Sequence, residues 1–450
     1  MSRIRPIVAG RALGLALAAL TLGACTNNPY PEQHDQQKVL YFEFDEAPKT
    51  LDPAVAYTTS AHEIIGKVCD TLLEYHYLKR PYELIPGLAN KVPAAETLPD
   101  GRVSYLFELR DDLLFQKDPC FAVSGAEPRR VVAQDVEFEL MRVADPAVNS
   151  PVIEPFSNLA GFREFSSKLL ELRKTPGFAK LGAREQYERV GPLSGARAVD
   201  RLRLRLTLDH PYPQILYWFA MPFTTPVPWE AVQYYDGKQG RDHLADHPVG
   251  SGPFALEVYD KQSRIVLGRN PNWYGVRHPE WKAPGATYPS QGEPSDEKAG
   301  RLDPSVVGKP LPFSERIEYR REKERIPAFN KFLQGYYDAS GILRESFDKV
   351  IREDRLSPEM SALGMQLDKS VIPAVYYIGF NMEDPLVGAK GGDSARKLRQ
   401  AMSLVVDAKE YCRLFLNGRG VPAHSVLAPG IYGYDENYRN PFRVVDVSKA

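Results

Sequence analysis

Apolar and polar residues alternate with a period of two in several short runs, the pattern of half-buried β-strands. Residues 38–46, KVLYFEFDE, are rich in β-branched and aromatic residues and predict a strand. Residues 103–115 alternate aromatic or aliphatic positions with polar ones, and residues 197–209 alternate leucines with arginines. Residues 255–275 predict a hairpin of two strands that closes on a loop. The chain therefore contains antiparallel strand pairs.

Other segments show the apolar spacing of amphipathic helices, in which residues three and four apart share a face. This spacing predicts helices at 61–73, 133–143 and 326–334, and a long helix at 395–416. Residues 163–190 are charged and helical in pattern, and we interpret them as a surface insertion.

The remaining pattern predicts a second region after a long loop. Residues 279–312 are rich in Pro, Gly and Ser and form the best candidate for a linker. A strand is predicted at 317–321, an edge at 337–342 and a buried strand at 375–382. Strands and helices alternate with hairpins between them, so we predict an α/β (mixed α+β) protein with at least two lobes and a boundary near residue 300.

The N-terminus has the pattern of an export signal. Three arginines precede residues 12–24, an uncharged and mostly apolar run. As a helix this run would be about 20 Å long, against about 30 Å for a hydrocarbon core, so we interpret residues 1–24 as a signal peptide. LGAC at 22–25 resembles a bacterial lipobox and predicts lipidation at Cys25; the alternative is ordinary cleavage beside an incidental cysteine. Residues 25–37 are polar and contain prolines, and we expect a flexible lipidated tether.

Composition excludes some functions. Lys and Arg number 57 against 58 Asp and Glu, and no basic run is interleaved with aromatics, so we expect no nucleic-acid partner. Without Cys25, three cysteines remain: either Cys69 and Cys120 form a disulfide, or Cys69, Cys120 and Cys412 are buried thiols. No CxxC motif or Cys/His cluster suggests a metal, and we expect no cofactor.

HPVGSGPF at 247–254 contains two glycines but lacks the spacing of a phosphate-binding loop. Ser251 lies in GSG rather than GxSxG, so a nucleophile turn is not indicated. Pro253 also removes an N–H that a phosphate cradle would use. We interpret Gly250 and Gly252 as a rigid turn that lets two backbones approach.

Two further chemical patterns are weak. His243 and His247 have the i, i+4 spacing of a helical metal pair, but Pro248 disfavours a helix there, and solvated loop histidines are expected instead. Residues 212–223, YPQILYWFAMPF, concentrate five aromatic residues that either line a cleft or pack in the core.

Eight segments together resemble one family. They are LDPAVAYTTSAHEIIGKVCDTLLEY (51–75), LIPGLANKV (84–92), VSYLFELRDDLLFQ (103–116), VVAQDVEFELMRVADP (131–146), PVGSGPFAL (248–256), IVLGRNPNWYG (265–275), YYIGFNMEDPLV (376–387) and the run at 395–430. In this order they resemble the family 5 solute-binding proteins, the oligopeptide, dipeptide or nickel-type periplasmic components of ABC importers.

The resemblance implies a two-lobe periplasmic binding protein type II fold with an extra subdomain in the N-terminal lobe. It places residues 38–62 and 198–300 in a hinge-bearing domain, 63–197 in an inserted subdomain and 305–450 in an incomplete second lobe. The family continues past the point that matches residue 450, so we expect a C-terminally truncated sequence. The family's ligand-anchoring aspartate has no matching position here.

The resemblance also implies a function: a monomeric lipoprotein on the periplasmic side of a bacterial membrane that captures a small ligand, above all a peptide. It would deliver this ligand to ABC permease subunits with their cytoplasmic ATPases, without enzymatic activity. The same fold could serve as a ligand sensor or chaperone, or bind a nickel complex, sugar or opine; a secreted hydrolase lacks its catalytic spacing. The candidate ligand-binding residues, each of which could instead only pack, are Tyr57, Thr58, Thr59, Asp70, Trp218, Tyr377 and Asn381.

Overall fold

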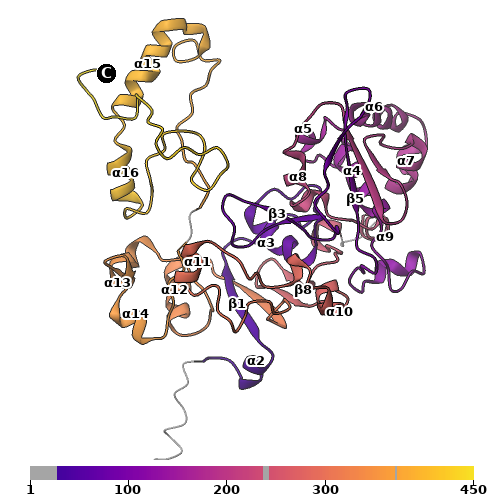
Figure 1. Ribbon diagram of the computed structural model, residues 1–450, viewed down its shortest axis with the longest axis horizontal. Helices are drawn as coiled ribbons and strands as arrows, with labels where there is room; N and C mark the ends of the chain where they lie inside the picture. The colour runs from indigo at the N-terminus through magenta and orange to yellow at the C-terminus, as the bar shows by residue number, and fades with distance from the viewer. Residues whose placement is uncertain (1–27, 237–242, 370–371) are drawn as a thin grey trace, which may run out of the picture. The chain divides into compact units, whose positions relative to one another are not determined.

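The computed structural model describes residues 28–236, 243–369 and 372–450 (Figure 1). The chain divides into two compact units. Unit 1 takes most of the chain up to Tyr288 and the segment Gly308–Gly341. Unit 2 consists of Tyr75–Ile85, Pro289–Val307 and Ile342–Ala450.

The first sheet of unit 1 has four strands in the order β1-β10-β9-β8. The strands are β1 (Val39–Phe44), β8 (Phe254–Asp260), β9 (Arg264–Arg269) and β10 (Arg316–Arg321). β1 runs parallel to β10, with Val39 opposite Arg316, and the other pairs are antiparallel. The predicted strand at 38–46 and the hairpin at 255–275 are confirmed.

One face of this sheet is covered by helix α3 (Thr59–Val68). Alternate residues of the strands point to this face, and the apolar stripe of α3 packs on them. The buried core so formed comprises Leu51, Ala56, Ala61, Ile64, Ile65, Val68, Cys69, Phe254, Ile265, Leu267, Ile317 and Tyr319.

The second sheet of unit 1 is antiparallel, in the order β4-β5-β7-β6. Its strands are β4 (Ala95–Thr97), β5 (Val103–Glu108), β6 (Ala196–Ala198) and β7 (Arg203–Leu208). The leucines of β7 are fully buried, which confirms the alternation read from 197–209. Helix α4 (Ala133–Ala144) contacts β6 and β7, and α6 (Phe162–Arg173) packs on α4 and on α7 (Ala183–Val190).

Short elements connect these layers in unit 1. They are α2 (Glu32–Gln36), α5 (Ile153–Phe156), α8 (Ile215–Trp218), α9 (Trp229–Tyr235), α10 (Tyr274–Arg277) and α12 (Arg325–Leu333). β2 (Leu73–Tyr75) pairs with β3 (Leu84–Pro86), and the division between the two units falls within both of these strands. Unit 2 contains α11 (Pro294–Lys298), α13 (Phe347–Val350), the β11 (Ile351–Arg352) and β12 (Arg355–Leu356) pair, α14 (Pro358–Ala362), α15 (Gly392–Leu404) and α16 (Ala408–Phe415). Among the described residues, none of the helices has the length and apolar character needed to cross a membrane.

The turn at 247–254 packs directly on the end of α3. The N–H of Gly252 donates to the carbonyl of Val68 at 2.8 Å. A Cβ atom on Gly250 would lie 2.0 Å from the same carbonyl oxygen. The expectation that these glycines allow two backbones to approach is therefore confirmed.

The prediction of one long helix at 395–416 is wrong, because this segment forms parts of two helices, α15 and α16. The Asp407 side chain accepts a hydrogen bond from the Glu410 N–H at 2.8 Å and starts α16 as its N-cap. A capping aspartate inside an apolar 3.6-residue pattern was the signal that the prediction overlooked.

The buried strand predicted at 375–382 is also wrong. This segment has no strand partner among the described residues, and Tyr376 and Tyr377 are 85% and 83% exposed. Strand geometry requires a neighbouring backbone for its N–H and C=O groups, and an apolar pattern alone cannot supply one. The edge predicted at 337–342 is likewise irregular.

Two boundaries differ from those expected. Residues 305–450 were assigned to the second lobe, but β10 is hydrogen-bonded between β1 and β9 in unit 1. The inserted subdomain was expected to end at residue 197, but β7 pairs with β5 and extends its sheet to residue 208. Both boundaries depend on which distant segments pair as strands, and this pairing cannot be predicted from local composition.

Candidate functional site

An aromatic cluster in unit 1 brings together two of the predicted ligand-binding residues. The Phe223 ring lies 6.0 Å from the ring of Tyr57 and 6.2 Å from that of Trp218, measured between centroids. His62 and Phe156 extend the cluster, at 5.2 Å from Phe223 and 6.0 Å from Trp218. Phe223 is fully buried whereas Tyr57 is 66% exposed, so the cluster rises from the core to the surface.

The backbone places these rings for identifiable reasons. Trp218 ends the short helix α8, and its indole N–H donates to the Tyr212 hydroxyl at 3.3 Å. Tyr57 precedes Thr58, whose hydroxyl accepts from the Ala61 N–H at 3.2 Å and caps α3. Thr58 and Thr59 are exposed beside Tyr57. Tyr57 and Trp218 therefore form one partly exposed group around Phe223, and Thr58 and Thr59 follow Tyr57 on the exposed surface.

Asp70 is held beneath the surface rather than at it. Its carboxylate accepts a hydrogen bond from the indole N–H of Trp273 at 2.8 Å, and its carbonyl accepts from the Thr225 hydroxyl. Burial, followed by repulsion from Glu74, raises the pKa of the Asp70 carboxyl well above its ordinary value. Asp70 thus ties the end of α3 to the 270–275 turn.

Glu74 forms the second half of this acidic pair. Burial raises its pKa to about 7, although the Arg110 guanidinium acts in the opposite direction. The carboxylate leaves no space for side chains at Gly87 and Gly285, because a Cβ at either would lie under 3.0 Å from it. The nearby hydroxyl of Tyr274 is buried without a hydrogen-bond partner in the described part of the chain.

A buried ion triad joins the loop before α3 to helix α4. Arg142 donates to Asp52 at 2.6 Å and to Glu139 at 2.7 Å. Glu139 is completely buried, and its second carboxylate oxygen has no partner among the described residues. Burial raises the pKa of Glu139 to about 8, against the attraction of Arg142. The spacing of Glu139 and Arg142, one turn apart on a predicted helix, was the available signal for this contact.

The two remaining predicted residues lie in unit 2. Tyr377 belongs to the exposed segment described above, and Asn381 starts a tight turn by accepting from the Glu383 N–H at 3.0 Å. Both remain predictions as ligand contacts.

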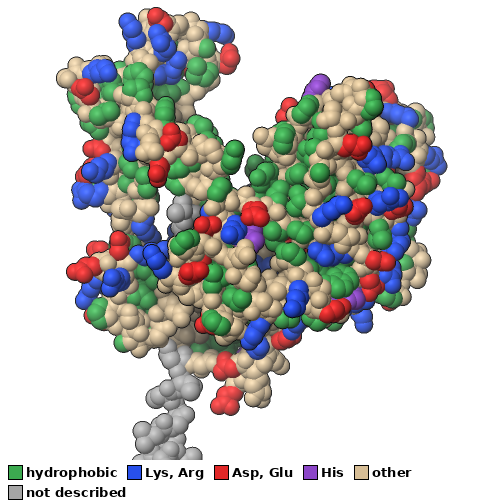
Figure 2. Space-filling view, in the orientation of Figure 1, with side chains coloured by type: hydrophobic (Ala, Val, Ile, Leu, Met, Phe, Trp, Pro, Cys, Tyr) green, Lys and Arg blue, Asp and Glu red, His purple; other side chains and the backbone are tan. Residues whose placement is uncertain are grey.

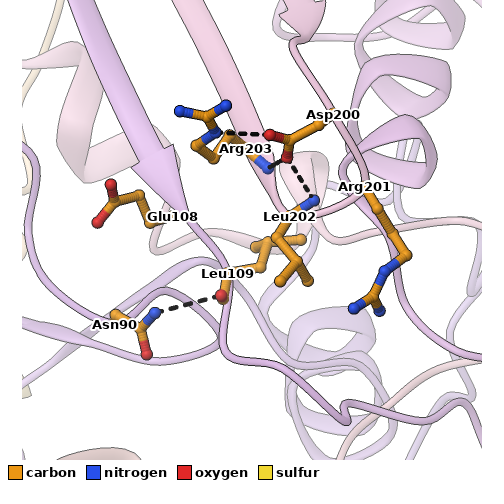
Figure 3. Close-up of a pocket in the computed structure, with 7 residues that line it drawn as sticks. All are labelled: Asn90, Glu108, Leu109, Asp200, Arg201, Leu202 and Arg203. Atoms are coloured by element: carbon orange, nitrogen blue, oxygen red, sulfur yellow. Dashed lines mark hydrogen bonds and ion pairs between the residues drawn. The ribbon is translucent and has the colours of Figure 1, made fainter.

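A shallow cavity of about 400 Å³ lies on the second sheet of unit 1 (Figure 3). It is lined by Asn90, Glu108, Leu109, Asp200, Arg201, Leu202 and Arg203. Its polar groups are already engaged: Asp200 pairs with Arg203 at 2.6 Å, and the Asn90 amide donates to the Leu109 carbonyl at 3.2 Å. None of the predicted ligand-binding residues lines it.

Acidic and basic side chains are interspersed over the face shown in Figure 2.

The cysteine alternatives are resolved in favour of thiols. Cys69 and Cys120 are free and buried, and Cys412 is free and partly exposed. Burial raises the pKa of the first two thiols, which keeps them protonated. In the described residues, no group of three or more His, Cys, Asp or Glu side chains could hold a metal ion.

One mixed sheet and one antiparallel sheet, each packed against helices, define a two-unit protein of mixed α/β class. Comparison with known proteins identifies the family. A model described as bacterial extracellular solute-binding proteins, family 5 Middle, matches residues 83–450. The chain belongs to this family.

Relatives within the family are distant. The chain is 28% identical over 287 residues to di/tripeptide-binding protein 4 of Pseudomonas aeruginosa, covering 61% of this chain and 44% of that protein. It is 23% identical over 436 residues to the dipeptide-binding protein of Escherichia coli, covering 95% of this chain and 63% of that protein. The chain thus spans less than two thirds of the length of these relatives.

Solved structures share the fold. The ABC transporter-associated periplasmic binding protein DppA from Helicobacter pylori, in complex with the peptide STSA, superposes with a TM-score of 0.60 at 18% identity, covering 93% of this chain and 66% of that one. The Escherichia coli murein tripeptide binding protein MppA gives a TM-score of 0.57 at 18% identity, covering 90% and 63%. The expected periplasmic binding protein fold is confirmed.

Proposed function

We propose that this protein captures a small peptide between two lobes and delivers it to the permease subunits of an ABC importer, which act with cytoplasmic ATPases. The observation that carries the proposal is the family match over residues 83–450, together with relatives named for di- and tripeptide binding. The exposed aromatic group around Phe223 supplies a surface on which such a ligand could rest.

The ligand would be held mainly through its backbone. A peptide bound as an added strand uses main-chain hydrogen bonds, so its side chains can vary. One lobe would contact the ligand through four residues of unit 1: Tyr57, Thr58, Thr59 and Trp218. The other lobe would contact it through Tyr377 and Asn381 of unit 2.

Asp70 has a different role in this proposal. Because its carboxylate is buried and already accepts from Trp273, Asp70 positions the segment after α3 and does not touch the ligand.

Binding energy would close the lobes. A ligand of micromolar affinity releases about 8 kcal/mol, which is enough to shift an open-favouring equilibrium of a few kcal/mol. The closed form would then dock on the permease as a monomer. Export by residues 1–24 and lipid attachment at Cys25 would hold the protein on the periplasmic side of a membrane.

Ligand identity is the sharpest test. Mass spectrometry of what co-purifies with the complete protein should find short peptides, and calorimetric titration should then give their affinity. A nickel complex, sugar or opine in their place would overturn the peptide assignment. Ligand binding without any effect on permease-dependent uptake would favour a sensor or chaperone role.

A matched pair of tryptophan variants tests the surface. Trp218→Ala should weaken peptide binding by up to about tenfold, since an aromatic contact contributes about 0.5–1.5 kcal/mol beyond the area that it buries. Trp229→Ala removes an equally large ring outside the aromatic cluster, where it stacks under Arg184, and should leave the affinity unchanged. Equal effects of the two variants would argue against this surface.

A further inference from the structure

Residues 28–37 of the segment expected to be a flexible tether are packed on unit 1, and residues 25–27 lie outside the described part of the chain. Residues 32–36 form helix α2, and Tyr30 stacks face to face on Tyr41 of strand β1, with 3.7 Å between ring centroids and 4° between ring planes. The Tyr30 hydroxyl donates to the Tyr336 carbonyl at 2.9 Å. This contact joins residues 306 positions apart in the sequence, which an unattached tether would not make.

A basic side chain closes the stack. The guanidinium of Arg320, on the neighbouring strand β10, lies 5.0 Å from the Tyr30 ring centroid and 5.3 Å from that of Tyr41. Cations at this distance from aromatic faces are attracted to them. His34 completes the contact through a hydrogen bond between its ring Nδ1 and the Tyr41 hydroxyl.

The segment is also fixed at both of its ends. The Asn28 amide donates to the Asp35 carboxylate at 3.0 Å and accepts from the Tyr30 N–H at 2.9 Å. At the other end Lys38 adopts a left-handed conformation with φ of 48°, which turns the chain from α2 into β1. These contacts include Asn28, which lies three residues after Cys25 in the sequence.

We propose that residues 28–38 form a fixed stem, which holds the α2 side of unit 1 at the headgroup surface of the membrane. Three peptide steps span at most about 11 Å, so the Cα of Cys25 can lie no farther than this from the Cα of Asn28, and a lipid on its side chain begins close by. A free tether of residues 25–37 would instead let the body rotate and move several tens of ångströms away. The membrane placement rests on the lipid anchor of the proposed function, whereas the packing of the stem does not.

Hydrogen exchange on the soluble protein tests the stem itself. Tyr30→Ala removes the stack and the hydrogen bond, and should speed exchange of the amides at 34–38 by about tenfold or more. Tyr30→Phe keeps the stack and should change exchange much less. If the amides at 34–38 exchanged equally fast in the unaltered protein and in Tyr30→Ala, the proposal that residues 28–38 are fixed on unit 1 would be overturned.

Energy transfer on vesicles tests the placement. In a Cys412→Ser background, a fluorophore on Gln33→Cys in α2 is compared with one on Glu185→Cys in α7; both positions are exposed and they lie far apart within unit 1 (Figure 1). With acceptors on the lipid headgroups, the lipidated protein should transfer strongly from residue 33 and weakly from residue 185. Tyr30→Ala should reduce this difference.

The outcomes separate the two claims. Equal transfer from both positions in the unaltered lipidated protein would overturn the membrane placement. Absence of fatty acid on the mature N-terminus would refute the anchor, and the placement with it, while the exchange result would still decide whether the stem is packed on unit 1.

Discussion

Replacement of Glu139 by glutamine should remove a large part of the pH dependence of unit 1's stability. Glu139 is completely buried, accepts from Arg142 through one oxygen, and has no partner for the other among the described residues. Arg142 also pairs with Asp52, so one cation faces two carboxyl groups. Burial disfavours the charged form of Glu139, and repulsion from Asp52 adds to this effect. Together they raise the pKa of Glu139 to about 8 against the attraction of Arg142.

The sign of the effect follows from proton binding. An unfolded Glu139 has its ordinary pKa of 4.5, so between pH 4.5 and 8 the folded state holds a proton that the unfolded state has lost. The free energy of unfolding therefore falls as the pH rises through this window, by at most about 1.4 kcal/mol per pH unit and about 5 kcal/mol in total. Glutamine keeps the shape of the protonated acid and cannot ionise.

Urea unfolding followed by tryptophan fluorescence at pH 5, 6, 7 and 8 measures this difference. All four tryptophans lie in unit 1, so the signal reports that unit. Glu139→Gln should match the unaltered protein at pH 5 and be more stable by several kcal/mol at pH 8. Asp135, which is buried, and Glu74, which is partly buried, have pKa values raised to about 6 and 7; both titrate in both proteins and cancel in the comparison.

The exposed control is Glu171→Gln, whose side chain is 70% accessible on α6 and should leave the pH curve unchanged. If the free energy of unfolding changed with pH in the same way for Glu139→Gln and the unaltered protein, the reasoning would be refuted. Glu139 would then titrate as an ordinary carboxyl in the folded state.

Three further predictions concern packing and thiol chemistry. Gly250→Ala should destabilise unit 1 by about 3 kcal/mol or more, because its Cβ would meet the Val68 carbonyl oxygen at 2.0 Å; a melting curve that matches the unaltered protein would contradict this. Trp273→Phe should cost about 1–3 kcal/mol in urea unfolding, since the buried Asp70 carboxyl loses its only side-chain donor among the described contacts, and an unchanged midpoint would count against that contact. Titration with a thiol reagent should modify Cys412 first and the two buried thiols only on unfolding; simultaneous reaction of all three in the native protein would disprove their burial.

Local periodicity correctly predicted the helices and strands in which the spacing of apolar residues alone decides which side chains are buried. The alternating leucines of β7 and the apolar stripe of α4 appear in the structure nearly as read, because strand and helix periods decide which residues face the core. Apart from the helix cap at Asp407, which is local, the failures involve partners distant in sequence. Residues 375–382 have a strand-like pattern but no strand partner in the described part of the chain. The stem at 28–38 is predicted to be flexible because Tyr336, the partner of Tyr30, lies 306 residues away.

The candidate site shows the same division. Tyr57 and Trp218 were chosen from separate segments, and the structure joins them through Phe223, a residue with no distinguishing motif. Asp70 is predicted as a ligand contact from its place at the helix end, and that prediction cannot foresee its hydrogen bond to Trp273, because the turn that carries Trp273 comes some 200 residues later. Chemistry-bearing residue types can be selected from sequence, whereas their hydrogen-bond partners follow from the pairing of distant strands and turns.

Small-angle X-ray scattering of the complete protein, with and without its tightest-binding short peptide, tests most directly whether the two lobes close on a ligand. The account predicts a smaller radius of gyration at saturating peptide and no change with a peptide that calorimetry shows not to bind. An unchanged radius of gyration at demonstrated saturation would contradict it.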